Sequence, residues 1–219
     1  MEPFLCDSGP ILPQPGYLQG AKDLCEKYNV LLHFDEVITG FRMALGGAQQ
    51  YYNVIPHIAT FAKAITGGYP LAVVAGRKDI MDAGVHASGT FNGNPVSVAA
   101  ALATIGILER PGVYEKLQTL GDRLCHGFEK LSKKHHIPLF CAAKGSIVEL
   151  QLGTAQEATT FRDFLQKADI EKYQKLFHTA KAYGVRITPL RGRIYLTTAH
   201  TEEDIDKTIE ILDVVFSQI

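Results

Sequence analysis

The sequence predicts an α/β fold in which a mostly parallel sheet is followed by a small α+β domain. Short apolar runs that end at polar or glycine residues predict buried strands, and a segment with helical apolar spacing precedes the first run. Beyond residue 108 the pattern changes to long amphipathic segments and isolated strand candidates. We therefore expect two domains, residues 1–108 and residues 109–219.

The first predicted domain begins with a helix and continues through three strands in a doubly wound layout. Apolar residues recur at helical spacing over residues 15–28, and Pro15 and Gly16 stand where a helix begins. The predicted strands are residues 30–34, 58–62 and 71–75. Asp35 and Lys63 directly follow the first two of them. Because open α/β sheets bind ligands beyond the carboxyl ends of their strands, both side chains are expected at one crevice.

Helices dominate the rest of the chain. Residues 96–108 are rich in alanine, and an apolar stripe marks a second helix over residues 113–131. Thr201 and Asp204 fit a capping box that opens a last helix. The other candidates are strands at residues 146–152 and 193–197 and a helix at residues 173–183.

The charge and hydropathy of the chain favour a small-molecule ligand. Of the 219 residues, 46% are hydrophobic, and 22 Lys and Arg balance 23 Asp and Glu. Since there is no basic run, no nucleic-acid partner is expected. No apolar stretch approaches the roughly 20 residues of a membrane span, and the first residues lack a basic start followed by an apolar block. We expect a cytoplasmic protein that is not inserted in a membrane.

Cysteine and histidine show no metal-site pattern. Adjacent His135 and His136 point in different directions on a helix, so no metal is predicted. No G-x-G-x-x-G lies between a strand and a helix, which argues against a nicotinamide dehydrogenase. The cysteines form no C-x-x-C pair and are too sparse for a disulfide scaffold, so buried or free thiols in a reducing compartment are expected. They are Cys6, Cys25, Cys125 and Cys141.

Three linked sequence blocks carry the chemistry. They are residues 33–42 (HFDEVITGFR), 61–68 (FAKAITGG) and 89–95 (GTFNGNP). Their residues, order and rough spacing resemble class III aminotransferases, most of all glutamate-1-semialdehyde aminomutase and its relatives, and the resemblance runs from Glu2 to Thr201. It implies a fold-type I enzyme that uses pyridoxal 5′-phosphate, of which this chain is the carboxyl-terminal half. It also implies a homodimer in the complete enzyme.

The resemblance implies a role for several residues, and the chemistry explains the residue types. Lys63 would form the Schiff base with the cofactor aldehyde and, once freed, move a proton between the substrate and the cofactor. Asp35 would face the pyridine nitrogen and favour its protonated form. Val37, two residues on along an extended segment, would pack against the ring. Gly89 and Thr90 resemble a turn that reaches a neighbouring subunit's cofactor phosphate.

Two regions bear on the substrate. Asp7 falls where the family places an Asn or Glu near the substrate, and its carboxylate could bind a substrate amine or pair with an arginine. Gly192 stands where semialdehyde aminomutases carry a glutamate, which argues against assuming their substrate. Arg191 or Arg193 could bind a carboxylate in a bidentate way, but a solvated loop arginine is the preferred interpretation.

Each catalytic role also has a structural alternative. Lys63 could be a solvated charge at a strand end, and Asp35 could cap a turn. Glu36 is assigned to structure, for instance in an ion pair with Arg42. Thr90 could be only a loop hydroxyl.

The expected activity is amino-group transfer between an amino acid or amine and a carbonyl acceptor. Class III enzymes are usually about twice as long, and the amino-terminal part that holds the cofactor phosphate has no counterpart here, so we expect a part of a longer or complemented enzyme. A glutamate-1-semialdehyde-type aminomutase is a close alternative, because the motifs do not report whether the intermediate is retained. The other alternative is a catalytically inactive truncated remnant that associates with a full-length relative.

Overall fold

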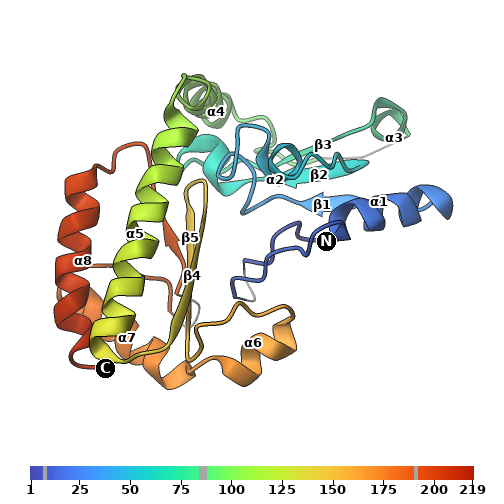
Figure 1. The fold of residues 1–219 in the computed structure, drawn as a ribbon. Coiled ribbons are helices and arrows are strands. Elements are labelled where there is room, and N and C mark those ends of the chain that lie inside the picture. The colour runs from blue at the N-terminus through green and yellow to red at the C-terminus, as the bar shows by residue number, and fades with distance from the viewer. Residues whose placement is uncertain (7–8, 84–87, 190–191) are drawn as a thin grey trace. The chain divides into compact units, whose positions relative to one another are not determined.

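The computed structural model describes residues 1–6, 9–83, 88–189 and 192–219 (Figure 1). The chain forms two compact units, each described here by itself. Unit 1 consists of Met1–Phe4 and Pro13–Val113, and unit 2 consists of Leu5–Leu12 and Tyr114–Ile219. The short segment Leu5–Leu12 therefore packs with residues that follow it by more than a hundred positions.

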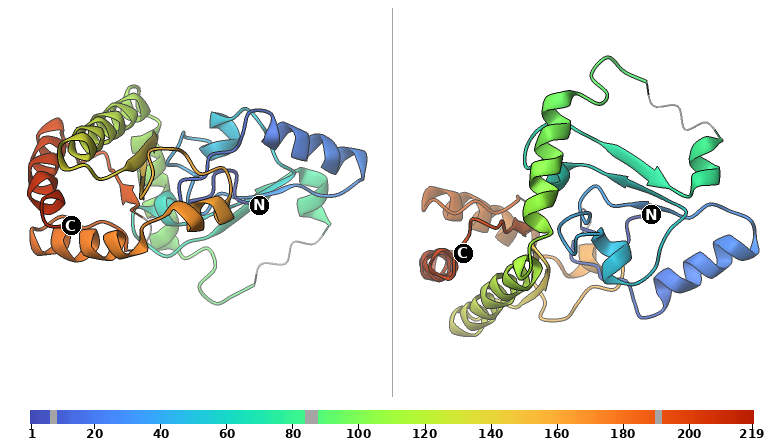
Figure 2. Two further views of the ribbon diagram at one scale, coloured as in Figure 1. Left: turned by 60° about the horizontal axis from the view of Figure 1, so that its bottom comes forward. Right: turned by 90° about the horizontal axis from the view of Figure 1, so that it is seen from above.

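Unit 1 contains a three-stranded sheet in the order β1-β2-β3. Strands β1 and β2 are parallel, and helix α4 packs against the 3₁₀ helix η1 that follows β2 (Figure 2). In chain order the elements are α1 (Tyr17–Lys27), β1 (His33–Asp35), α2 (Gly47–Tyr51), β2 (Ile58–Phe61), η1 (Lys63–Thr66), β3 (Val73–Gly76), α3 (Lys78–Asp82) and α4 (Pro95–Leu108).

The third strand departs from the expected parallel arrangement. β3 runs antiparallel to β2, with Thr60 opposite Val74. A parallel partner needs a crossover of a dozen or more residues, usually a helix, to return the chain to the same starting edge. Here the chain passes only through η1 and a short loop before β3, so it turns straight back. The apolar run identified the strand but carried no information on its direction.

The core of unit 1 lies between helix α1 and the first two strands. Leu32 and Phe34 are buried while His33 and Asp35 are exposed, the alternation of a strand with one covered face. Because the apolar side chains point to the covered face, the polar ones stand on the open face near the strand end. The core cluster consists of Leu18, Leu32, Phe34, Val54 and Ala59.

Unit 2 is built on an antiparallel sheet in the order β4-β5-β6. The elements are α5 (Val113–His135), β4 (Leu139–Lys144), β5 (Ile147–Leu152), α6 (Phe161–Lys167), α7 (Ile170–Ala182), β6 (Ile194–Tyr195) and α8 (Glu202–Phe216). The amphipathic segments of the sequence form the long helices of this unit, but the sequence analysis does not predict the strand β4.

The helices of the described part of the chain were also compared with the requirements of a membrane span. None of them, taken singly, has both the length and the apolar character that a span requires.

Close helix packing and caps define unit 2. Gly127 of α5 faces Ile209 of α8 so closely that a Cβ at Gly127 would overlap it. The predicted capping box is confirmed: the Thr201 hydroxyl accepts from the Asp204 amide at 3.2 Å, and the Asp204 carboxylate accepts from the Thr201 amide at 2.9 Å. The buried hydroxyl of Tyr173 on α7 donates to the carbonyl of Leu150 at 2.7 Å, which ties α7 to β5.

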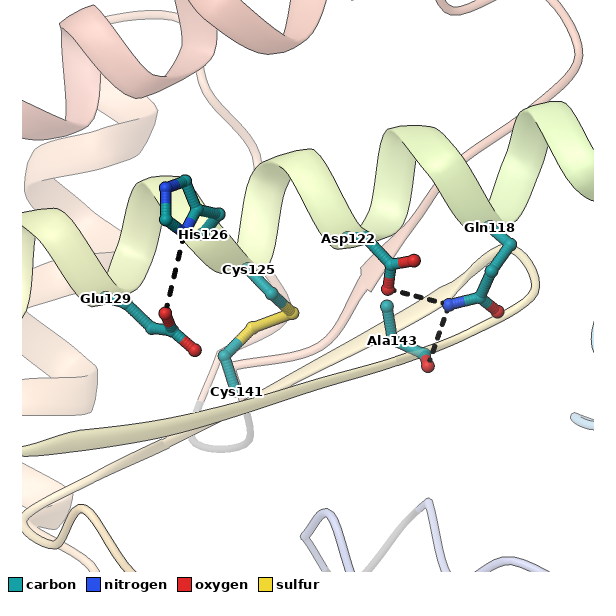
Figure 3. Close-up of a disulfide and its surroundings, with 7 residues drawn as sticks. All are labelled: Gln118, Asp122, Cys125, His126, Glu129, Cys141 and Ala143. Atoms are coloured by element: carbon teal, nitrogen blue, oxygen red, sulfur yellow. Dashed lines mark hydrogen bonds and ion pairs between the residues drawn. A yellow bond between two sulfur atoms is a disulfide. The ribbon is translucent and has the colours of Figure 1, made fainter.

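A disulfide joins Cys125 of α5 to Cys141 of β4 (Figure 3). Their Cα atoms are 5.4 Å apart, inside the range that a disulfide spans. The expectation of unpaired thiols was wrong for this pair, because residues 16 positions apart are brought together only by the packing of a helix on a strand. Among the described residues, Cys6 and Cys25 take no part in a disulfide.

Candidate functional site

Asp35 and Lys63 lie at one edge of the unit 1 sheet. Asp35 is the last residue of β1 and pairs in register with Thr60 of β2, and Lys63 follows the end of β2 as the first residue of η1. Adjacent parallel strands lie about 4.8 Å apart and end at the same edge. The sheet thus presents a carboxylate and an amine at neighbouring strand ends.

Lys63 combines a constrained backbone with an exposed side chain. Its φ is +53°, a left-handed conformation that is uncommon for residues other than glycine. The following Ile65 and Thr66 are buried, and the Thr66 hydroxyl donates to the carbonyl of Tyr69, which holds the turn in place. Within the described residues the Lys63 amine has no ion-pair partner. Strained backbone of this kind persists where the surrounding structure enforces it, often at functional sites.

The carboxylate of Asp35 is fixed by its own turn. Its Oδ1 accepts a hydrogen bond from the amide of Val37 at 3.0 Å, and the side chain remains exposed. The extended segment expected to reach Val37 ends at Asp35, and Val37 lies in a turn. Asp35 therefore caps that turn, which is the structural role that the sequence offered as an alternative to a catalytic one. This cap also orients the carboxylate, so it is compatible with a role in binding.

Glu36 is a buried structural residue. Its carboxylate accepts hydrogen bonds from the Thr39 hydroxyl at 2.8 Å and from the amides of Ala48 at 2.7 Å and Gln49 at 2.9 Å. The last two amides open helix α2, where a negative charge is stabilised by the unpaired N–H groups and the helix dipole. Gly47 has a φ of +74°, and a Cβ there would overlap the carboxylate. Glu36 therefore fixes the loop that follows Asp35.

The Gly89–Pro95 block forms an exposed turn followed by a helix cap. The Asn92 amide donates to the Gly89 carbonyl at 3.0 Å, and Gly89 and Thr90 are exposed. The Asn94 side chain accepts from the Val96 amide at 3.0 Å and caps α4, with Pro95 at the first helical position. Neither Gly89 nor Thr90 hydrogen-bonds to Asp35 or Lys63. Asp7 and Arg191 lie outside the described residues.

Arg193 is buried rather than solvated, contrary to the preferred interpretation of the sequence. It is 5% exposed, and its Nε donates to Oε1 of the fully buried Glu149 at 2.6 Å. Its other nitrogens donate to the Tyr195 hydroxyl at 3.1 Å and to the Cys6 carbonyl. Burial by itself lowers the pKa of Arg193, but Glu149 and Tyr195 outweigh it and raise the pKa, so the guanidinium stays charged.

A signal for this burial was present in the sequence. Glu149 stands inside the apolar run that forms β5, and a carboxylate in such a strand requires a buried donor. The partner could not be chosen from the sequence, because any of several distant cations could reach a strand whose neighbours were unknown.

Comparison with known proteins gives a family match for the sequence and several solved structures with a similar fold. A family model of class-III aminotransferases matches residues 1–216. Among similar solved structures, an omega-transaminase from Sphaerobacter thermophilus has 24% identity and a TM-score of 0.87, over 98% of this chain and 50% of that chain. A glutamate-1-semialdehyde aminomutase from Pseudomonas aeruginosa PAO1 has 21% identity and a TM-score of 0.88, again over 98% and 50%.

A third similar structure is the PLP internal aldimine form of the FumI protein of Sphingopyxis sp. MTA144, with 24% identity and a TM-score of 0.81, over 96% of this chain and 48% of that chain. This chain spans about half the length of these proteins. At such identities the structural likeness shows the fold alone. The family match, which extends over nearly the whole chain, agrees with the resemblance of the three sequence blocks, and the chain belongs to the class-III aminotransferase family.

Proposed function

We propose that this chain carries the Lys63 and Asp35 side of a pyridoxal-phosphate site and acts in transferring an amino group between an amino acid or amine and a carbonyl acceptor. One observation carries the proposal. In a chain of the class-III aminotransferase family, an amine and a carboxylate stand at the ends of two adjacent parallel strands. Open α/β sheets bind ligands at this edge.

The donor set at the edge fits the cofactor. An exposed lysine without an ion-pair partner among the described residues suits a bond to an aldehyde carbon, and a carboxylate suits a protonated pyridine nitrogen. When bound, pyridoxal phosphate withdraws electrons from the substrate carbon next to the amine. Val37 belongs to the same turn as Asp35, and the proposal assigns it to contact with the ring.

The two polar side chains would divide the work. Lys63 would hold the aldehyde end of the cofactor, and its amine, once released, would accept and return the proton of the substrate carbon. Its constrained backbone limits where that amine can reach. Asp35 would hold the opposite end of the ring and keep the nitrogen protonated, because a negative charge close by raises the pKa of that group.

The remaining assignments concern what lies beyond this edge. Gly89 and Thr90 are proposed to contact the cofactor phosphate of a neighbouring subunit in a homodimer, which agrees with their exposure. Asp7 is proposed to contact the substrate. The substrates are small molecules, and an aminomutase reaction at the same residues remains the close alternative. Within the chain, residues 1–108 are proposed as part of the cofactor-binding domain and residues 109–219 as the small domain.

We also propose that activity requires the rest of an enzyme of the relatives' length or an associated relative. The apolar helix α4 leaves Leu102 68% and Val96 60% exposed, and Val74 of β3 is exposed as well. Apolar surface of this extent favours association. The chain by itself is therefore expected to bind the cofactor weakly, to show little turnover and to self-associate. The alternative, a catalytically inactive truncated remnant, differs in its expected result: such a chain would gain no activity with any partner.

Borohydride reduction tests the central assignment. At saturating pyridoxal phosphate, reduction should fix a pyridoxyl group on Lys63, found by peptide mass spectrometry, and Lys63→Ala should remove the cofactor absorbance that depends on the covalent bond. Lys78→Ala, which changes an exposed lysine of the same unit, is the control and should keep both signals. Labelling at other lysines, with full absorbance in Lys63→Ala, would refute the proposal. Light scattering during the titration reports whether the chain is a monomer.

A further inference from the structure

Two adjoining hollows open on the surface of unit 2, beside helix α8. Their volumes are about 510 and 450 Å³, each within the range of small-molecule sites. Every residue that lines them belongs to unit 2. We call the two hollows together the α8 groove, and four residues line both of them: Gly184, Val185, His200 and Thr208.

The inner wall of the groove is apolar. Leu196 and Ile205 line it and are 5% and 2% exposed. Val185 reaches it through the turn that ends α7, in which Gly184 has a φ of +84° and the Val185 amide donates to the Ala180 carbonyl at 2.9 Å. Both features are typical of a helix end that is closed by a left-handed glycine. The wall can therefore cover the hydrocarbon part of a ligand, which is stabilised by leaving water.

His200 presents a hydrogen-bond donor to the groove. The amide of Thr197 donates to Nδ1 of His200 at 3.0 Å. Because a main-chain amide can only donate, Nδ1 is the acceptor of the neutral ring and Nε2 carries the proton. Among the described residues no hydrogen bond reaches Nε2, and the ring lines both hollows. Nε2 is thus available to an acceptor atom of a ligand.

Two cationic side chains stand along the same groove. Arg186 lines the first hollow and Lys207 lines the second. Neither forms an ion pair or a hydrogen bond with another residue that the structure describes. The planar fork of a guanidinium can bind both oxygens of a carboxylate, and an ammonium adds a point charge.

The other charged residues of the groove are already engaged. Asp204 is the one acid among the described lining residues, and its carboxylate accepts from the Thr201 amide at 2.9 Å and from the Thr201 hydroxyl at 2.8 Å. Arg193 also lines the first hollow, and its charge is balanced by Glu149. Two positive charges therefore face one negative charge, which favours a ligand with a single negative charge.

We propose that the α8 groove binds a small organic carboxylate with an apolar body. Arg186 and Lys207 attract the carboxylate, Nε2 of His200 donates to it, and the wall around Val185 covers the body. The site goes beyond the proposed function and does not depend on it, because it is built by unit 2 alone and requires no cofactor.

A nuclear magnetic resonance titration of the chain without cofactor tests the groove with three probes. Phenylpropanoate carries a carboxylate and an apolar body, acetate carries only the carboxylate, and phenylpropanol carries only the body. Phenylpropanoate should bind at least about fivefold more tightly than either of the others. Its shifts should map to the amides of residues 184–188 and 199–208. No binding of phenylpropanoate, equal binding of acetate or of phenylpropanol, or shifts confined to other residues would overturn the proposal.

Charge variants test which side chains hold the carboxylate. Arg186→Gln should weaken phenylpropanoate binding about fivefold and Lys207→Gln about twofold, while the weaker binding of phenylpropanol should stay unchanged in both folded variants. Lys175→Gln is the matched control, because it removes the same charge from α7, where Lys175 pairs with Glu171 at 3.1 Å. Unchanged affinity in Arg186→Gln, or an equal loss in Lys175→Gln, would show that the groove does not recognise the carboxylate.

Discussion

Nε of Arg193 lies 2.6 Å from Oε1 of Glu149, and both side chains are buried. Removing one partner leaves the other charge buried, so Arg193→Met and Glu149→Leu should each lower the free energy of unfolding by about 3–5 kcal/mol. The double variant should lose far less than the sum, because no charge then remains inside. Urea unfolding of the four proteins measures the coupling.

The surface pair of the same unit calibrates that experiment. Arg123 and Asp206 form an exposed ion pair at 2.6 Å, and Arg123→Met should cost about 1 kcal/mol or less. Additive effects of the Arg193 and Glu149 changes would show that the two charges do not stabilise one another.

Asp35→Asn separates holding the cofactor from activating it. The amide keeps the shape of the side chain but not its charge, so Lys63 should still bind the cofactor while turnover in an active assembly falls at least about tenfold, since a nearby opposite charge shifts a pKa by about 1–3 units. Absorbance and amino-transfer rate are measured on the same samples. If Asp35→Asn turns over as fast as the native protein, Asp35 does not act by keeping the pyridine nitrogen protonated. Asp35→Glu, which restores the charge, should recover part of the rate.

Replacement by methionine should change the free energy of unfolding in opposite directions at Gln151 and at Gln118. Both amide atoms of Gln151 are buried without a hydrogen-bond partner in the described part of the chain, so Gln151→Met should raise the free energy of unfolding by about 1–3 kcal/mol. Gln118 accepts from the Gly145 amide at 2.8 Å, and it donates to Asp122 at 2.8 Å, the contact drawn in Figure 3. Gln118→Met should therefore lower the free energy of unfolding by about 1 kcal/mol. Thermal unfolding compares the pair. A loss of stability in both would mean that Gln151 is hydrogen-bonded in solution.

The Cys125–Cys141 disulfide should contribute to the stability of unit 2. Closing a loop of this length restricts the unfolded chain by about 3 kcal/mol, so reduction with dithiothreitol should lower the free energy of unfolding by about that amount. The double variant Cys125→Ser/Cys141→Ser should match the reduced protein and no longer respond to the reductant. Cys25→Ser, at a free thiol, should retain the full response. Mass spectrometry of the unreduced protein checks that the pair forms, and two alkylated thiols at these positions would show that it does not.

Much of this protein could be predicted from local patterns. The pattern predicts a strand over residues 58–62, and β2 spans Ile58–Phe61; the alanine-rich segment forms α4, and the Thr201–Asp204 capping box opens α8. These features depend on interactions within a few residues: side-chain period, a cap and a proline at a helix start. The same locality allowed Asp35 and Lys63 to be nominated, because each is defined by the strand immediately before it.

Only the tertiary structure decided which distant segments meet. The direction of β3, the strand β4, the assignment of Leu5–Leu12 to unit 2 and the Glu149–Arg193 pair all depend on contacts across the chain. Glu149 in an apolar strand indicates a buried charge, but it does not identify the partner 44 residues away. In the same way, the position of Cys125 in the sequence does not identify Cys141 as its partner. Pairing of this kind is set by how helices and strands pack to bury apolar surface, and a local pattern constrains which face of an element is buried without specifying what covers it.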